Sequence, residues 1–302
     1  MALHIFANIV TSFGTAANNR AENEGNITTL QKLIWKGQTH STVSAEAIRF
    51  ALRRQFSETE QTNRSWDEVA RANVWKDHKF SGWADPKKNV YIDDDVLGYM
   101  TAEASNEEGS AGSANVRRAV LEITRAVSLT PWPGDVTFNA ASPGATPSAA
   151  KKGTNPVPYG TELHATRYQF GAALTPNRLR DPNRAKTAIE GLCSLRTVAG
   201  NHGRFLFDFS PDVVVFRVTT DPSPRFLYCF DTRDNGASVD ADALVKRIDS
   251  GDIDPSELFV GSSDVNSTLA KQLQSKGVQI SGVKATSKSV ITAFEKLYSI
   301  KA

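Results

Sequence analysis

The sequence has little of what marks secreted, membrane or disulfide-stabilised proteins. Its 302 residues include only two cysteines, Cys193 and Cys229, far apart and outside any CxxC pair. This excludes a disulfide scaffold, and their apolar neighbours predict two buried thiols. No apolar run approaches the roughly 20 residues that a membrane span needs. The first residues lack the basic segment of a signal peptide. We therefore expect a soluble cytoplasmic protein without a membrane partner.

The sequence also lacks the short motifs of nucleotide-dependent and metal-dependent enzymes. No P-loop, dinucleotide fingerprint, HExxH, GxSxG or kinase pattern is present, and the five histidines show no metal-ligand spacing. Three consecutive carboxylates, Asp93, Asp94 and Asp95, are a weak metal signal. Neighbouring residues on one helix or strand point apart, so we expect one of them to cap a helix N-terminus instead. The sequence predicts no cofactor and no metal site.

Excess charge is missing too, because the net charge is only +2. Bulk charge therefore gives no argument for nucleic acid. Residues 131–204, however, carry nine basic and four acidic side chains, a local net charge of 9 − 4 = +5. A basic segment in a near-neutral chain indicates a surface that faces a polyanion.

The clearest element present is an amphipathic helix at residues 42–54 (TVSAEAIRFALRR), after an extended run at residues 3–13. Two hydroxyl residues, Thr42 and Ser44, lie where an N-cap is expected. Arg49 and Arg53, four residues apart, form a ridge beside the apolar face. A helix N-terminus with nearby arginines suits a phosphate chain. An ordinary solvated helix face is the alternative, and the helical pattern alone favours that alternative.

Residues 55–88 are charged and rich in tryptophan. Part of this stretch, SWDEVARANVWKDHKF, has helical spacing and a capping box formed by Ser65 and Glu68. We expect an inserted helical lobe with its tryptophans in a small core. Aromatic rings interleaved with lysines also suit base stacking. The three tryptophans are Trp66, Trp75 and Trp83.

The middle of the chain breaks all periodicity. Residues 103–113 are acidic and glycine-rich and predict a loop, and residues 116–129 form an extended or helical element. Residues 129–159 contain six of the 13 prolines and predict a protruding arm. In the AGNHGR turn, residues 199–204, an anion-binding nest and a plain connector are equally good interpretations.

The second half predicts a mixed α and β pattern. A strand is expected at residues 161–174, a basic helix at 181–198, and strands in RFLFDF, DVVVFRVT and PRFLYCF. The tail alternates: helix 241–249, strand LFVG, helix 265–275, strand VQIS and helix 289–298.

Taken in order, these segments resemble a known family. After the N-terminal strand come ANNRAENEGNIT, VSAEAIRFALR, DDDVLGYM, RRAVLEITRAVSL, YGTELHATRYQFGAAL and LRTVAGNHGRFLFDFSPDVVVFRVT, over roughly residues 1–230. The resemblance is specific because three segments occur together: VSAEAIR, DVLGYM and GNHGRFLFDFSPD. The chain resembles the DevR-type CRISPR-associated backbone subunits of type I effector complexes (the Cascade backbone), most closely type I-B.

The resemblance implies an α+β fold with an RRM-like (ferredoxin-like) palm spanning residues 1–302. It places a helical fingers lobe at 55–110, a thumb at 129–160 and a C-terminal βα lobe at 238–302, packed on the palm. Copies would line up head to tail on the CRISPR RNA, beside other Cascade subunits, and each thumb would push one base out at a regular interval. The guide would then pair with target DNA. The aromatic base-stacking signature of an ordinary RRM is absent, which suits backbone recognition.

The resemblance also assigns residues, because in the family the helix at residues 44–53 and the loop at 18–20 face the RNA. This favours phosphate binding by Arg49 and Arg53 over the solvated interpretation. The expected phosphate contacts are Arg20, Lys32, Arg49 and Arg53, with Arg117 and Arg118 as further candidates. The expected backbone or sugar contacts are Asn18, Asn19, Ser44, Asn201 and His202. The candidates for the base wedge are Trp132, Phe138 and Tyr159.

Related subunits of type III systems cut RNA with an aspartate in the loop after the first strand. Here that loop carries Glu22 and Glu24 and no aspartate, so we expect no catalytic residue and no enzyme activity. The alternatives are a metal-dependent endoribonuclease of the same architecture, using Asp93, Asp94 and Asp95 or the two glutamates, and a generic RNA-binding module unrelated to CRISPR.

Overall fold

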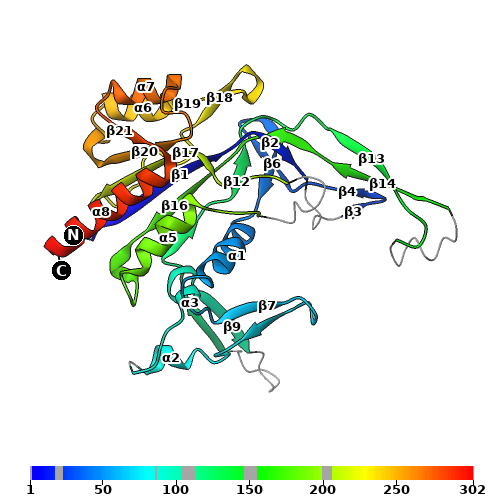
Figure 1. The fold of residues 1–302 in the computed structure, drawn as a ribbon, viewed down its shortest axis with the longest axis horizontal. Coiled ribbons are helices and arrows are strands. Elements are labelled where there is room, and N and C mark those ends of the chain that lie inside the picture. Colours follow the sequence, from blue (N-terminus) through cyan, green and yellow to red (C-terminus); the bar gives the residue numbers. More distant parts are fainter. Residues whose placement is uncertain are drawn as a thin grey trace.

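The computed structural model describes residues 2–17, 23–85, 87–103, 113–145, 155–198 and 206–301. These residues form a mixed α+β fold around a nine-stranded sheet (Figure 1). The strand order is β21-β20-β17-β1-β16-β12-β6-β5, and β11 also pairs with β16. Only the β20–β21 pair in this sheet is parallel. The strands are β1 (His4–Thr11), β5 (Lys32–Trp35), β6 (Gln38–Val43), β11 (Leu121–Ile123), β12 (Ala126–Ser128), β16 (Tyr168–Leu174), β17 (Pro211–Thr219), β20 (Leu258–Ser262) and β21 (Gln279–Ser281).

The expected first strand is confirmed as β1, which lies between β16 and β17. Successive side chains of a strand point to opposite faces. Ile5 and Ile9 therefore enter the hydrophobic cluster on one face, while Phe6 and Val10 enter the cluster on the other. Because both faces are covered, the residues of β1 after His4 are all buried, including the polar Asn8 and Thr11.

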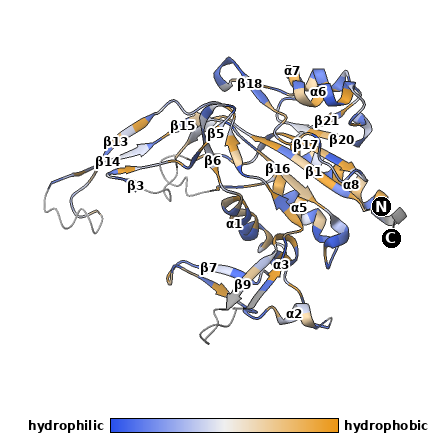
Figure 2. Cartoon of the chain, turned by 180° about the vertical axis from the view of Figure 1, so that it is seen from behind, coloured by the Kyte–Doolittle hydropathy of each residue, from blue (hydrophilic) through white to orange (hydrophobic). Residues whose placement is uncertain are grey.

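Helices cover both faces of the sheet. α1 (Ala45–Phe56), α3 (Ile92–Leu97), α5 (Arg184–Cys193) and α8 (Val283–Lys301) pack on one face. α6 (Asp242–Asp249) and α7 (Thr268–Gln274) pack on the other. The central strands carry hydrophobic colour in Figure 2, whereas α1 is coloured mainly hydrophilic. The expected alternation of the tail is confirmed as α6, β20, α7, β21 and α8, with the last helix longer than predicted. None of the helices described here is long and apolar enough to cross a bilayer.

The described residues of the predicted arm form a hairpin, not an irregular loop. β13 (Val136–Ala141) pairs antiparallel with β14 (Val157–Glu162), and β14 pairs with β4 (Ile27–Thr28), which pairs with β3 (Asn23–Glu24). Figure 1 shows this four-stranded unit extending away from the central sheet. We call it the arm.

The expected helix in SWDEVARANVWKDHKF is wrong. β7 (Arg64–Asp67) and β8 (Ala72–Trp75) form a hairpin there. The carboxylate of Asp67 accepts hydrogen bonds from the backbone N–H groups of Val69 and Ala70, both at 2.8 Å, and Arg71 adopts a left-handed φ of 49°. This turn chemistry outweighs the helical spacing. With α2 (Ser81–Ala84), β9 (Tyr99–Glu103) and β10 (Ser113–Arg117), the hairpin makes a unit that we call the hairpin lobe.

Other expected strands are interrupted or absent. The expected strand at residues 161–174 is divided among the end of β14, β15 (His164–Thr166), which pairs with β2 (Gly14–Ala16), and β16. The described residues 206–209 and residues 224–230 contain no strand. Phe207 and Phe209 pack instead on Tyr168, and left-handed Arg225 and Tyr228 break the second segment. Short elements complete the fold: β18 (Asp231–Arg233), β19 (Ser238–Asp240), η1 (Pro176–Arg178), η2 (Asp234–Gly236) and η3 (Pro255–Glu257).

Candidate nucleic-acid interface

The predicted helix begins and packs as its sequence indicates. Ser44 is the N-cap of α1, and its hydroxyl accepts a hydrogen bond from the Ala47 N–H at 3.2 Å. Ile48, Leu52 and Phe56 are fully buried in the core. Because these three residues fix the inner face, Arg49 and Arg53, each one position after an inward residue, lie beside that face. Figure 1 shows α1 between the arm and the hairpin lobe.

Two of the three arginines of α1 carry donors that are hidden from water and lack a partner within the described residues. The Nε of Arg49 and the Nη1 of Arg53 are both in this state. The Nε of Arg53 pairs with Asp93 at 3.2 Å. Burial, and then repulsion by Arg64, lowers the pKa of Arg53 to about 10, against the attraction of Asp93. A buried donor without an acceptor costs free energy that an incoming anion would recover.

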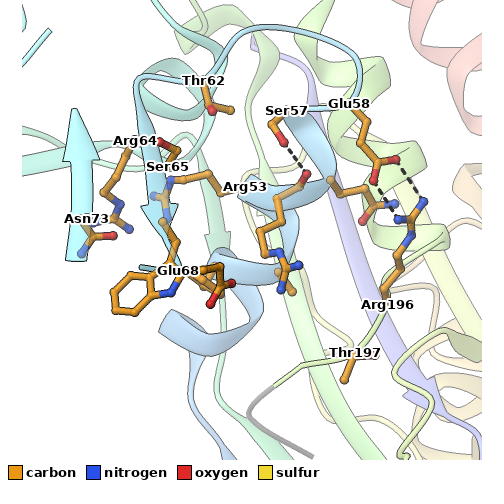
Figure 3. Close-up of a pocket in the computed structure, with 15 residues that line it drawn as sticks. Arg53, Ser57, Glu58, Thr62, Arg64, Ser65, Glu68, Asn73, Arg196 and Thr197 are labelled. Atoms are coloured by element: carbon orange, nitrogen blue, oxygen red, sulfur yellow. Dashed lines mark hydrogen bonds and ion pairs between the residues drawn. The ribbon is translucent and has the colours of Figure 1, made fainter. Parts of the chain in front are cut away.

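A cleft of about 460 Å³ lies beside this helix face. The C-terminal half of α1 forms one wall, the β7–β8 hairpin another, and Arg196 and Thr197 a third (Figure 3). Four arginines line it: Arg53, Arg54, Arg64 and Arg196. Arg196 forms a two-point ion pair with Glu58, with distances of 2.8 and 3.0 Å. Arg64 has no ion pair among the described side chains.

The three consecutive aspartates do not cap their own helix, so this prediction is wrong. The N-cap of α3 is Tyr91, without a side-chain hydrogen bond. Asp93 instead accepts hydrogen bonds from Arg53 and from the backbone N–H groups of Asn63 and Arg64. Burial, and then repulsion by Asp93, raises the pKa of Asp94 to about 7.

Asp95 is fully buried and joins the hairpin lobe to α5. It pairs with Arg117 at 2.7 Å and with Arg184 at 2.9 Å, and it accepts hydrogen bonds from the N–H groups of Arg180 and Asp181. Asp95 therefore points away from Asp93 and Asp94, which both accept hydrogen bonds from Asn63. Among the residues with described positions, no group of three or more potential ligands is arranged to hold a metal ion.

Lys32 lies at the base of the arm, where internal partners already engage it. Its Nζ pairs with Glu162 at 2.6 Å and lies 4.0 Å from the ring centroid of Trp132. The indole N–H of Trp132 donates to the Leu163 carbonyl at 2.8 Å. The structure thus gives Lys32 and Trp132 a role in fixing the arm to the sheet.

The other candidates for the base wedge lie further along the arm. Phe138 on β13 is 80% exposed. Tyr159 on β14 is half-buried and lies opposite Asn139 in the ladder. Of the three predicted wedge residues, Phe138 is the one whose ring is offered to solvent.

The two further basic candidates differ from each other. Arg117 pairs with Asp95, donates to the Arg178 carbonyl at 3.0 Å and stacks on Trp83 at 4.0 Å, so its contacts are internal. Arg118 is exposed. The predicted contacts Asn18, Asn19, Arg20, Asn201 and His202, and Glu22 of the alternative, lie outside the described residues. Glu24 is exposed on β3.

The sequence reasoning missed Arg64, Trp66 and Arg196 as cleft residues. Arg64 and Trp66 are two apart on β7 and therefore share a face of the hairpin. The period-two signal in R-S-W was present, but the helical interpretation of this stretch concealed it. Arg196 comes from a distant segment, so no local pattern predicts its position beside α1.

Comparisons with known proteins add to this geometry. Residues 10–190 match the family described as "CRISPR-associated negative auto-regulator DevR/Csa2". The chain is 60% identical over 273 residues to the "CRISPR-associated protein Cas7/Cst2/DevR" of Myxococcus xanthus (strain DK1622), with 90% of each chain covered. Two solved structures share the fold. One is described as "CRISPR RNA-guided surveillance complex" (TM-score 0.57, 15% identity) and the other as "CRISPR RNA-guided surveillance complex, pre-nicking" (TM-score 0.59, 11% identity), and each match covers 96% of this chain and 100% of the other.

Proposed function

Because the chain belongs to the DevR/Csa2 family of CRISPR-associated proteins, we propose that it is a structural subunit that holds the CRISPR RNA in a type I effector complex. The solved structures with the same fold are parts of RNA-guided surveillance complexes. In this proposal, several copies line up head to tail along one guide, beside other subunits of a type I-B-like Cascade. The guide is then presented for pairing with target DNA.

The central sheet supports an RRM-like palm within this proposal. The order β17-β1-β16-β12 is antiparallel throughout, with α1 following β1 and α5 following β16. Both helices contribute to the hydrophobic cluster on one face. In our proposal, this order corresponds to the split βαβ arrangement of ferredoxin-like folds. The hairpin lobe then corresponds to the fingers, and the arm corresponds to the thumb.

One observation carries the RNA-holding role: the arginines of α1 have donors that are buried and unpaired in the described structure. A guanidinium fork suits phosphate oxygens. Contacts to phosphates carry no sequence information, which a guide-holding protein requires because base pairing reads the sequence. The exposed ring of Phe138 is our candidate for the wedge that separates adjacent bases.

We also propose that the subunit has no nuclease activity of its own. Two of the carboxylates that a metal-dependent cut would use, Asp93 and Asp95, instead hold arginines and backbone N–H groups. Incubating the RNA-bound chain with complementary RNA and magnesium should leave that RNA intact. Regularly spaced cuts would contradict this part of the proposal.

The direct test of RNA holding reverses charge on α1. Arg49→Glu with Arg53→Glu should abolish retention of guide RNA during purification of the co-expressed complex, because like charge then faces the phosphates. The control is Lys246→Glu with Lys271→Glu, the same charge change on exposed lysines of α6 and α7 on the other face of the sheet. Circular dichroism checks that each variant is folded.

Native mass spectrometry of the same complexes gives the number of copies per guide, and the proposal expects more than one. Full RNA retention by the α1 variant, or a single copy per RNA, would contradict the proposal.

A further inference from the structure

The β7–β8 wall of the cleft beside α1 is lined by Arg64, Ser65, Trp66, Glu68 and Asn73. In the β7–β8 ladder, Arg64 lies opposite Trp75 and Trp66 lies opposite Asn73. Side chains two apart on a strand, and those directly opposite, share one face. Arg64, Trp66 and Asn73 all line the cleft, and Figure 3 shows Arg64 and Asn73 side by side on the hairpin.

Trp66 differs from the other two tryptophans of the hairpin lobe. Trp75 packs edge-on against Phe80, and Trp83 packs against Tyr99 and under Arg117. Trp66 has no such ring or cation partner among the described residues, and it remains half-exposed. The small aromatic core of the lobe thus uses two tryptophans and leaves the third for the cleft.

Two guanidinium groups flank the same space, and the carboxylate of Asp93 attracts both of them. Arg53 on α1 and Arg64 on β7 each have a nitrogen that is buried and unpaired in the described structure, Nη1 in Arg53 and Nε in Arg64. Each charge disfavours the other, and Asp93 pairs only with Arg53. A doubly liganded anion would satisfy both groups at once, and phosphate is the anion that matches the arginine fork.

The size of the cleft fits a ligand larger than an ion. Its volume of about 460 Å³ falls within the roughly 300–1,000 Å³ of small-molecule sites. An aromatic ring beside a pair of arginines is the combination that binds a base and its phosphate. Two carboxylates line the cleft: Glu58, which Arg196 already holds, and the exposed Glu68 of the β7–β8 turn.

We propose that this cleft binds one nucleotide of single-stranded RNA, with the base stacked on Trp66 and the phosphate held by Arg53 and Arg64. The inference rests on the proposed function, since it names a subsite for the strand that α1 holds. Every base has a π-face, so stacking on Trp66 requires no particular sequence.

The test combines a protein change with an RNA change. The full chain is titrated by fluorescence anisotropy with a short single-stranded RNA and with the same ribose-phosphate strand lacking all bases. Trp66→Leu should weaken binding of the ordinary RNA by about tenfold, the order expected for one stacked base. Trp66→Phe should restore most of this loss. Neither change should affect binding of the strand without bases, because only the stacking partner has been removed.

The phosphate half of the site has its own matched pair. Arg64→Gln should weaken binding of both strands, because it removes a phosphate ligand. Arg71→Gln removes the same charge from the exposed turn of the same hairpin and should leave binding within about twofold of the wild type. If the two substitutions weakened binding equally, Arg64 would contribute only to the overall positive charge. Its assignment as a phosphate ligand would then be overturned.

Three results would overturn the nucleotide site. The first is that Trp66→Leu leaves RNA binding unchanged. The second is that Trp66→Leu weakens binding of both strands equally, which would indicate a structural role. The third is that it weakens binding of free uridine monophosphate but not of RNA, which would make the cleft a mononucleotide site. If the wild-type chain bound neither strand, the proposed function would fail together with this inference; in the three cases above, RNA holding itself survives.

Discussion

The arginines of the C-terminal lobe and those around the cleft differ in how completely they are paired. In the C-terminal lobe, Arg233 pairs with Asp240 and Asp242, and Arg247 pairs with Asp252, all on an exposed surface. Around the cleft, Arg49, Arg53 and Arg64 each have a buried donor without an acceptor in the described structure. The same residue type is thus internally satisfied in one region and available for an anion in the other. In our proposal, the state of pairing, more than the number of charges, indicates where a polyanion would bind.

Removing a buried carboxylate should produce the largest difference between the two regions. Asp95→Ala should lower the free energy of unfolding by about 3–5 kcal/mol, because it leaves two buried arginines, Arg117 and Arg184, without their shared anion. Asp252→Ala removes an exposed partner of Arg247 and should hardly move the midpoint of urea unfolding. Equal losses in the two variants would mean that the buried pairs of the hairpin lobe carry no special weight.

The pH dependence of the free energy of unfolding should give the next largest difference between the two regions. Asp94 has a pKa of about 7 in the folded chain because of burial and Asp93, against about 4 in an unfolded chain. Between these values the folded state holds the extra proton, so Asp94 makes the free energy of unfolding fall as pH rises. The slope reaches about 1.4 kcal/mol per pH unit. Asp94→Asn should remove this slope, as measured by the difference from wild type in urea unfolding at pH 4 to 8.

Asp252 serves as a control, because its contribution to the free energy of unfolding changes with pH in the opposite direction to that of Asp94. Arg247 lowers its pKa, so its contribution is present above the ordinary aspartate range and is lost only as pH falls below about 4. Asp252→Asn should therefore leave the curve between pH 5 and 8 parallel to that of wild type. His164 also titrates below its usual range, because burial lowers its pKa to about 4. Its contribution cancels when each variant is compared with wild type at the same pH.

The smallest effect on stability should come from the arm, where an aromatic ring with internal contacts can be compared with a ring that is exposed to solvent. Phe138→Ala changes an 80% exposed ring and should alter stability by less than about 0.5 kcal/mol. It should nevertheless lower the fluorescence of 2-aminopurine placed at the unstacked position of a bound guide, because the wedge is gone. Trp132→Ala should destabilise the arm instead. The Trp132 ring contacts the ammonium group of Lys32, and its indole N–H donates a hydrogen bond to the Leu163 carbonyl. Unchanged 2-aminopurine fluorescence in Phe138→Ala would remove Phe138 as the wedge.

The elements that could be predicted from the sequence are those fixed by local signals. The cap at Ser44, the apolar face of α1 and the position of Arg49 and Arg53 all follow from residues within one helix. The βα alternation of the tail is likewise local. The β7–β8 hairpin was missed because the turn at Asp67 competes with a helical pattern of equal length.

The remaining differences arise from partners that lie far apart in the sequence. Asp95 receives Arg184 from 89 residues away, and Lys32 meets Glu162 across 130 residues. No window of the sequence contains both members of such a pair, so the aspartates were interpreted as a cap and Lys32 as a phosphate ligand. The resemblance to a family directed attention to α1, but the cleft and its unpaired donors emerged only from the folded chain.

The most direct test of RNA holding by α1 is the salt dependence of RNA affinity for wild type and for Arg49→Gln with Arg53→Gln, on two single-stranded RNAs of unrelated sequence. If the two arginines bind phosphates, the slope of log affinity against log salt should fall in magnitude by about 1.4, or about 0.7 for each lost contact, and by the same amount on both RNAs. An unchanged slope, or a change confined to one sequence, would contradict the account.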